Sequence, residues 1–394
     1  MNKQELDLLF CSLPAVSVFR AVTEKPAMKT LCKFISHDDK DMFGKMKLYG
    51  EFVNSLSQYG FSFSDFLKKS IYEDENEYVI RTANSKEIPP CLENNAKREL
   101  DIFSSLTSLT PEILCSFAPK GVYIPSFINE ETDFNRQYES RLKNISSYGY
   151  GIFSSAVMFR VENNEIIPVH SADSIDESVF VGYEEERKKV YDNTQALIEG
   201  RPAANTLLFG DAGTGKSSTV KACVNHFAPK GLRLIELRKD QLFSLSKIMD
   251  SIAENPLKFI IFIDDLSFNK NDDCFSMLKA ALEGSASAKA DNAVIYATSN
   301  RRHIVKENFS DREDDNDIHH SDTVQELMSL SDRFGLTVYF SRPNKALYLD
   351  IIHALALRHG ITPDAELDRK AENFALAKGS RSPRAAEQFI NSVI

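Results

Sequence analysis

The sequence predicts an α/β protein with a parallel sheet, helices on both faces of that sheet, a small helical part after it and a mostly helical domain before it. Three observations predict this fold. A short apolar run at residues 207–209 ends in a glycine-rich loop that leads into a helix near residue 216. A second apolar run, residues 259–263, ends in two aspartates. Both runs are typical of parallel strands buried on both faces. Residues 347–394 have the pattern of three further helices.

The composition is that of an ordinary globular chain with room for two or three domains. The chain has 394 residues, 42% of them hydrophobic, and its net charge is −10, from 47 basic and 57 acidic residues. This charge gives no overall field for nucleic acid or an anionic membrane. The six cysteines are scattered without a C-x-x-C pair, which excludes zinc and redox motifs of that type and favours reduced thiols. No stretch approaches transmembrane length, so we expect a cytoplasmic protein with no membrane partner.

The N-terminal part is expected to form a mostly helical domain, but the sequence gives no sign of its role. Apolar residues recur at helical spacing, for example from Phe43 to Leu56. The aromatic residues Phe61, Phe63 and Phe66 are expected to lie in a core rather than on a binding surface, because phenylalanine is among the most often buried residue types.

A β-hairpin is predicted at residues 156–169, where two apolar runs flank a polar turn. The polar stretch 171–178 follows and has the composition of a linker. We therefore expect three parts: a mostly helical domain at 1–170, a nucleotide-binding α/β domain at 178–341 and a helical lid at 342–394.

Residues 180–183, Phe-Val-Gly-Tyr, precede a charged helix predicted over 184–198. An apolar stretch with a glycine, a short way before a phosphate-binding loop, can wrap an adenine base. The same residues also fit a plain turn between a strand and a helix. The loop that comes next favours the binding interpretation, in which Val181 and Gly182 contact the nucleotide.

Residues 206–219, TLLFGDAGTGKSST, contain the Walker A pattern G-x-x-x-x-G-K-[ST]. Its glycines let backbone N–H groups turn toward phosphate oxygens, and the helix N-terminus adds partial positive charge there. Lys216 is expected to reach the β and γ phosphates of ATP, and the Ser217 hydroxyl to bind Mg²⁺. A plain glycine turn is disfavoured, because strand, loop and helix follow in the required order. The predicted nucleotide-binding residues are Gly210, Asp211, Ala212, Gly213, Thr214, Gly215, Lys216, Ser217 and Ser218.

The two aspartates after the apolar run 259–263 match a Walker B motif. Ligands of open α/β sheets bind at the carboxyl ends of the strands, where these carboxylates emerge. Asp264 is expected to act on Mg²⁺, directly or through water, and Asp265 to polarise the attacking water. A further buried strand, 294–300, ends in Asn300, which could orient that water or touch the γ phosphate. An asparagine at a strand end is also a common turn former.

Three arginines near predicted element starts are candidate phosphate contacts. Arg333 stands just before an apolar strand at 336–340, near the nucleotide end of the sheet, and is a candidate arginine finger; an ion pair with Asp332 is the alternative. Arg381 and Arg384 lie at the start of the last helix, where acids are the usual choice, so one of them is expected to face an anion such as an ATP phosphate. The last two helices are expected to start at Thr362-Pro363 and Ser382-Pro383, with proline in the first turn.

Taken together, these motifs resemble the AAA+ ATPases over roughly residues 178–394. The resemblance implies a P-loop NTPase sheet with a C-terminal lid, an ATPase that uses Mg²⁺, and a homo-oligomer. It also implies that Asn300 is sensor 1, Arg333 an arginine finger acting in trans, and Arg384 sensor 2. More narrowly, the segments DDLSF (264–268), LKAALEG (278–284), YATSNRRH (296–303) and SLSDRFGL (329–336) resemble the bacterial domain of unknown function 815 family.

The chain departs from the AAA+ pattern in two places. Asp265 replaces the usual glutamate and is one methylene shorter, so hydrolysis is expected to be slow. The turn after the strand 232–237 lacks the aromatic-apolar-glycine loop of protein-threading members, which disfavours an unfoldase.

The expected function is an ATP-driven switch that remodels a bound partner, an unidentified protein client held by the N-terminal domain. One alternative is a nucleic-acid-associated AAA+ protein similar to initiators or helicase loaders. The basic residues 301–303 and the pair Arg238-Lys239 motivate it, while the net negative charge argues against it. A second alternative, motivated by Asp265, is a nucleotide-gated scaffold with negligible turnover.

Overall fold

The computed structural model describes residues 3–38, 40–169, 180–266, 273–282, 291–300 and 333–394. The chain divides into two compact units, Met1–Ser155 and Ala156–Ile394. Across the described ranges, no helix combines the length and the apolar character needed to cross a bilayer.

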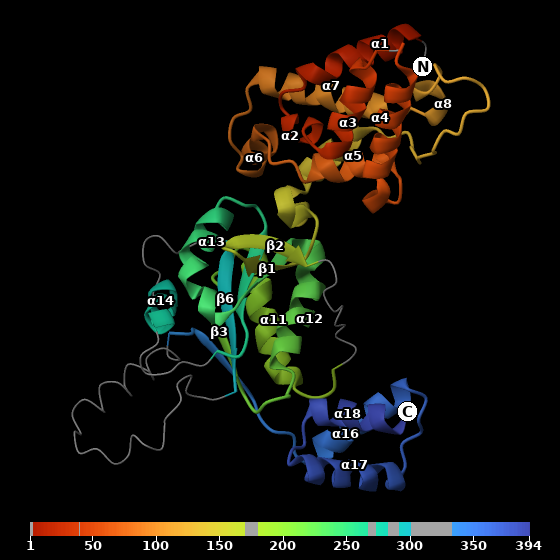
Figure 1. The fold of residues 1–394 in the computed structure, drawn as a ribbon. Helices are drawn as coiled ribbons and strands as arrows, with labels where there is room; N and C mark the ends of the chain where they lie inside the picture. Colours follow the sequence, from red (N-terminus) through yellow and green to blue (C-terminus); the bar gives the residue numbers. More distant parts are fainter. Residues whose placement is uncertain (1–2, 39, 170–179, 267–272, 283–290, 301–332) are drawn as a thin grey trace. The chain divides into compact units, whose positions relative to one another are not determined.

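Unit 1 is helical, as its apolar spacing predicts (Figure 1). Several of its helices begin at a capping side chain: Asp41, Ser62, Asn76 and Asp133 each accept a hydrogen bond from the backbone N–H three residues later. The helices are α1 (Lys3–Ser12), α2 (Arg20–Thr23), α3 (Pro26–Ser36), α4 (Met42–Ser55), α5 (Phe63–Tyr72), α6 (Glu77–Ala83), α7 (Pro90–Leu106), α8 (Pro111–Leu114), α9 (Phe134–Lys143) and α10 (Ile145–Tyr148), with short 3-10 turns η1 (Leu13–Ala15), η2 (Ser57–Tyr59) and η3 (Gly151–Ser154).

The core of unit 1 is rich in aromatic rings. Phe52 and Phe63 meet edge to face with centroids 5.2 Å apart, and Phe66 is buried beside them. The burial of Phe63 and Phe66 confirms the prediction of a core, but Phe61 is exposed, because the left-handed turn of residues 60 and 61 directs it outward. Phe43, which fits the apolar spacing of its helix, is 84% exposed in the first turn of α4.

A buried carboxylate joins the start of the chain to α7. The oxygens of Glu99 accept hydrogen bonds of 2.8–3.1 Å from the backbone N–H groups of Ser17, Val18 and Phe19. These amides come directly before α2, which has no side-chain cap of its own. Glu99 therefore satisfies three consecutive N–H groups of the segment that leads into α2, although it lies 80 residues away from Phe19 in the chain.

Unit 2 is built on a seven-stranded sheet in the order β2-β1-β4-β5-β6-β3-β7. Every neighbouring pair is parallel except β1 and β2. The strand that carries the glycine loop, β3, lies between β6 and β7, and this sheet confirms the predicted α/β P-loop NTPase fold. The strands are β1 (Met158–Glu162), β2 (Glu165–Val169), β3 (Thr206–Gly210), β4 (Leu232–Leu237), β5 (Lys258–Ile263), β6 (Ala293–Ser299) and β7 (Leu336–Phe340).

Helices cover both faces of this sheet (Figure 1). On one face, Val190 of α11 (Glu184–Ile198) and Val220 of α12 (Lys216–Phe227) share an apolar cluster with strand residues such as Leu208 and Ile260. Helix α13 (Leu245–Ile252) lies on the other side, and α14 (Asp273–Leu282) follows β5. Two 3-10 turns, η5 (Ala228–Lys230) and η6 (Lys239–Ser244), flank β4.

The predicted hairpin exists, but it belongs to the sheet. Strand β1 pairs in parallel with β4, with Met158 opposite Leu234, and thereby extends the sheet by two strands. The boundary between the compact units therefore lies between Ser155 and Ala156, and the expected boundary near residue 170 is too late. The linker predicted at 171–178 lies outside the described residues.

The C-terminal residues form three helices, as predicted: α16 (Lys345–Arg358), α17 (Ala365–Lys378) and α18 (Pro383–Val393). They share an apolar cluster that includes Ile352 and Phe389. The start of α18 is the predicted one, with Ser382 as its cap. The start of α17 is later than predicted, because Asp364 rather than Thr362 caps it, and its carboxylate accepts from the N–H of Leu367 at 2.7 Å.

Candidate active site

The carboxyl ends of β3, β5 and β6 lie side by side. The register pairs Phe209 with Ser299, and Ile263 with Ala297, so the residues that follow each strand emerge at one edge of the sheet. The glycine loop follows β3 and leads into α12, which begins at Lys216. Gly210 has φ +139°, and a Cβ there would lie 2.0 Å from the carbonyl oxygen of Phe340. Only glycine fits this position, where the loop passes the end of β7.

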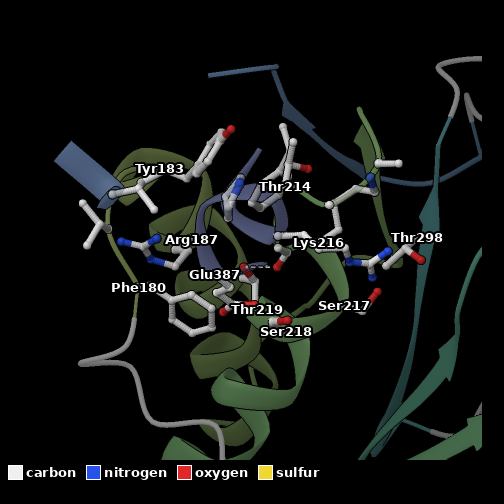
Figure 2. Close-up of a pocket in the computed structure, with 18 of the residues that line it drawn as sticks. Phe180, Tyr183, Arg187, Thr214, Lys216, Ser217, Ser218, Thr219, Thr298 and Glu387 are labelled. Atoms are coloured by element: carbon white, nitrogen blue, oxygen red, sulfur yellow. Dashed lines mark hydrogen bonds between the residues drawn. The ribbon is translucent and has the colours of Figure 1, made fainter. Parts of the chain in front are cut away.

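A cavity of about 400 Å³ opens at this edge, between the sheet and the C-terminal helices (Figure 2). Most of the predicted nucleotide-binding residues line it: Val181, Ala212, Gly213, Thr214, Gly215, Lys216, Ser217, Ser218, Asp264, Asp265, Asn300 and Arg384. Three predicted contacts do not line it: Gly182, Gly210 and Asp211. The last two instead face Lys216 through their backbone carbonyls.

Lys216 is held at the loop by three hydrogen bonds. Its ammonium donates to the carbonyl oxygens of Gly210 at 3.0 Å and Asp211 at 2.8 Å, and to Oδ1 of Asn300 at 3.1 Å. Its side chain is buried, and this burial lowers its pKa from the ordinary value, with the carboxylates of the site acting in the opposite direction. The cation is therefore directed at the edge where the strands end, and Figure 2 shows it in the middle of the cavity.

Asp264 and Ser217 supply oxygen ligands beside the loop. The Ser217 hydroxyl donates to Oδ1 of Asp264 at 2.6 Å, and the Thr298 hydroxyl donates to the same oxygen at 2.5 Å. Within the described residues, no three His, Cys, Asp or Glu side chains gather as a metal site. A single carboxylate with a hydroxyl nevertheless suits Mg²⁺, which takes hard oxygen ligands and usually combines one or two carboxylates with phosphate oxygens and water.

Asp265 and Asn300 are joined by a hydrogen bond. The side-chain amide of Asn300 donates to Oδ1 of Asp265 at 2.8 Å, while its carbonyl oxygen accepts from Lys216. Asp265 has φ +51°, in the left-handed region that few residues other than glycine adopt. Asn300 thus links the cation of the loop to the second aspartate.

The stretch 180–183 lies at the cavity, with Phe180, Val181 and Tyr183 in its wall. Gly182 turns away: it has φ +76°, and a Cβ there would lie 2.5 Å from Cδ1 of Leu347 in α16. Arg187, one turn into α11, donates to the carbonyl oxygen of Gly182, and its guanidinium lies 5.4 Å from the centroid of the Phe180 ring. Figure 2 shows Phe180 and Arg187 together at one side of the cavity and Thr298 at the other.

The two arginines near the start of α18, Arg381 and Arg384, have different surroundings. Arg381 is engaged by Glu372, with its Nε and Nη2 donating to the two carboxylate oxygens at 3.1 and 2.9 Å. Arg384 lines the cavity, and its backbone N–H donates to the carbonyl oxygen of Gly213 at 3.3 Å. Of the two, Arg384 is therefore the one placed to meet a ligand of the loop.

Arg333 lies at the opposite end of the sheet from the cavity. It comes before β7, whose first residue, Leu336, pairs with Thr206 at the start of β3. The glycine loop begins at the other end, where Gly210 pairs with Phe340. Because the two strands are parallel, the start of β7 lies at the amino edge of the sheet. The prediction that Arg333 lies near the nucleotide end is therefore wrong. Its alternative partner, Asp332, and the basic residues 301–303 lie outside the described residues.

Several residues of the cavity wall are not among the predicted site residues: Tyr183, Arg187, Thr219, Thr298, Phe340, Ile351, Leu355, Pro383 and Glu387. Some could have been found by periodicity. Thr298 of β6 lies two residues before Asn300, the spacing at which side chains along a strand point the same way. Glu387 lies three residues after Arg384, on the same face of α18. The apolar residues of α16 carry no such signal, since their spacing also fits a helix core.

The family model described as "Protein of unknown function (DUF815)" matches residues 154–394. The chain belongs to this family. The match confirms the resemblance seen in the sequence segments and covers the whole of unit 2. A search of curated proteins found no match.

Among solved structures, the chain is similar to the Thermotoga maritima RuvB Holliday junction branch migration motor, at 12% identity and a TM-score of 0.32. That match covers 55% of this chain and 71% of the RuvB chain. A point mutant of the same RuvB matches at 14% identity and a TM-score of 0.35, over 56% of this chain and 73% of that one. Likenesses this weak say nothing about the function of this chain.

Proposed function

We propose that this protein binds ATP with Mg²⁺ in the cavity between the sheet and the C-terminal helices, and hydrolyses it to remodel a bound partner. One observation supports this most strongly. Side chains from four separate strand and helix ends meet at one cavity beside a glycine loop: Lys216, Asp264, Asp265, Asn300 and Arg384. Two cations, two carboxylates and an amide at such a loop match the needs of phosphoryl transfer to water.

In this proposal the phosphate groups lie on the loop 210–215 and the first turn of α12. The N–H groups of that turn have no intrahelical partners, and the helix N-terminus carries partial positive charge. Lys216 and Arg384, which both line the cavity, add two full charges. The adenine base lies against Phe180 and Val181, where the Phe180 ring offers a flat apolar face and the Arg187 guanidinium lies 5.4 Å from the centroid of that ring.

The proposed Mg²⁺ ligand set is the Ser217 hydroxyl and the Asp264 carboxylate, completed by phosphate oxygens and water. When bound, the ion neutralises charge on the phosphate oxygens. The protein's own contribution is orientation. Asp264 receives the hydroxyls of Ser217 and Thr298 on one oxygen, which fixes the plane of its carboxylate.

Asp265 is the proposed general base for the attacking water. Its carboxylate can take a proton, and we propose that Asn300, which donates to one of its oxygens, orients the same water. Aspartate is one methylene shorter than the glutamate that stands there in most AAA+ proteins, so we expect slow turnover.

The C-terminal helices are the proposed lid, because they contact both the glycine loop and the stretch 180–183. Arg384 of α18 bonds to the loop through Gly213, and Gly182 packs on Leu347 of α16. A change at the phosphates can therefore pass to α18 through Gly213, and a change at the stretch 180–183 can pass to α16 through Gly182. The partner is proposed to be a protein held by unit 1, and the working form a homo-oligomer with Arg333 acting in trans.

Nucleic acid remains the less favoured client, because the net charge is −10. A cytoplasmic location belongs to the same proposal, since the six cysteines are scattered and form no paired motif.

Isothermal titration with ATP and Mg²⁺ tests the proposal. Lys216→Ala removes the buried cation of the loop, and hydrogen bonds from charged donors are worth enough that affinity should fall about 10–100-fold. The matched control is Lys221→Ala, on the same helix, whose ammonium lies 3.8 Å from Glu236 and outside the cavity. Equal affinity of Lys216→Ala and the wild type would overturn the assignment of the loop.

A further inference from the structure

Thr298 contacts three consecutive residues of the turn that follows β5. Its hydroxyl donates to Oδ1 of Asp264 at 2.5 Å and accepts from the backbone N–H of Asp265 at 2.9 Å. Its carbonyl oxygen accepts from the N–H of Leu266 at 2.7 Å. A hydroxyl carries one donor and two acceptor lone pairs, so a single side chain can make both bonds at once. Thr298 is 2% exposed, and Leu266 is fully buried.

The turn that Thr298 contacts is strained. Asp265 has φ +51°, and residues other than glycine persist in this region only where the surroundings over-determine them. The N–H groups of Asp265 and Leu266 both bond to Thr298, on the neighbouring strand β6. These bonds fix the backbone direction at the residue whose carboxylate faces the cavity.

We propose that Thr298 is the positioning residue of both carboxylates: it sets the side chain of Asp264 and the backbone of Asp265 through one hydroxyl. Its role differs from that of Asn300, which bonds to the side chain of Asp265 and to Lys216. The inference rests on the proposed function, since it assigns Asp264 to Mg²⁺ and Asp265 to the attacking water.

Two substitutions separate this role from plain packing. Thr298→Val keeps the shape of the side chain but removes the donor and the acceptor, and Thr298→Ser keeps both. The matched control is Thr206→Val, which removes an equally buried hydroxyl from the neighbouring strand β3. The Thr206 hydroxyl bonds to Ala204 and Asn193, away from the cavity.

With ATP, Thr298→Val should lose roughly tenfold or more in kcat, because it loses a hydrogen bond to a charged group. It should also lose the part of the ATP affinity that depends on Mg²⁺, while its affinity measured in EDTA stays unchanged. Thr298→Ser and Thr206→Val should retain the wild-type kcat and Mg²⁺ dependence. Wild-type behaviour of Thr298→Val, or an equal loss in Thr206→Val or Thr298→Ser, would overturn the proposal.

A measurement without nucleotide distinguishes a failure of the Thr298 proposal from a failure of the proposed ATPase function. Hydrogen-exchange mass spectrometry follows the peptide that contains Asp265, whose N–H loses its Thr298 partner in Thr298→Val. Exchange there should be faster in Thr298→Val alone among the three variants. Unchanged exchange in Thr298→Val refutes the role of Thr298 even if ATP is hydrolysed. Faster exchange in Thr298→Val, together with a wild type that binds no ATP, leaves the role of Thr298 standing and refutes only the proposed function.

Discussion

Replacing Arg333 by alanine tests whether the protein works as an oligomer. The register of β3 and β7 runs from the pair Thr206–Leu336 to the pair Gly210–Phe340, four residue steps of about 3.3 Å or ~13 Å in all. Arg333 lies three residues before that first pair, at the far edge. This separation exceeds the reach of an arginine side chain, so Arg333 cannot touch the phosphates of its own subunit.

If Arg333 completes the site of a neighbouring copy, its guanidinium stabilises charge that develops in the transition state. Such fingers are worth ~10³–10⁵ in rate, which corresponds to about 4–7 kcal/mol. Arg333→Ala should therefore bind ATP as the wild type does and release phosphate at least ~10³ times more slowly. Arg201→Ala is the control, because Arg201 also precedes the start of β3 and pairs on the surface with Glu199.

Phosphate release is measured against protein concentration and in mixtures. Specific activity of the wild type should rise with concentration. Mixing Arg333→Ala with Lys216→Ala should restore part of the activity, because some interfaces then pair an intact loop with an intact finger. Full activity of Arg333→Ala, or a wild-type specific activity that does not change with concentration, would refute the trans arrangement.

Two further predictions concern single side chains. Arg384→Ala should weaken ATP binding about tenfold or more, whereas Arg381→Ala should leave it unchanged because Arg381 pairs with Glu372; titration calorimetry on both variants checks this, and the reverse order would contradict the assignment. Burial raises the pKa of Asp74 in unit 1 to about 6, so its ionisation destabilises the fold increasingly as pH rises from about 4 to about 6. Asp74→Asn should therefore raise the free energy of unfolding by about 1–3 kcal/mol at pH 7 and by less near pH 4.5; urea unfolding at both values checks this, and an equal gain at both would contradict it.

Features that depend on residues close together in the chain could be predicted from the sequence. The glycine loop at 210–215 follows from residues adjacent in the chain, because strand, loop and helix are written in order. The same holds for the cap at Ser382, where the side chain and the amide it accepts from are three residues apart. Asp264, Asp265 and Asn300 could be placed at one edge, because parallel strands present their carboxyl ends together.

Features that depend on which strands pair in the sheet could not be predicted from the sequence. Nothing near Met158 indicates that its strand pairs with Leu234, so the hairpin was assigned to the wrong part of the chain. Arg333 was placed at the wrong edge because its position depends on the direction of β7 in the sheet. The sequence does not single out Thr298, since its role depends on a left-handed turn contributed by a different strand end.

Phosphate release from ATP by the wild type beside Asp265→Asn tests the central claim most directly. Asparagine has the shape of aspartate and tolerates the left-handed conformation, but its amide cannot take a proton from water. The account predicts Mg²⁺-dependent phosphate release by the wild type, and undiminished ATP binding with release reduced about 10²–10⁴-fold in Asp265→Asn. Release by Asp265→Asn at the wild-type rate, or none by the wild type at any protein concentration, would contradict it.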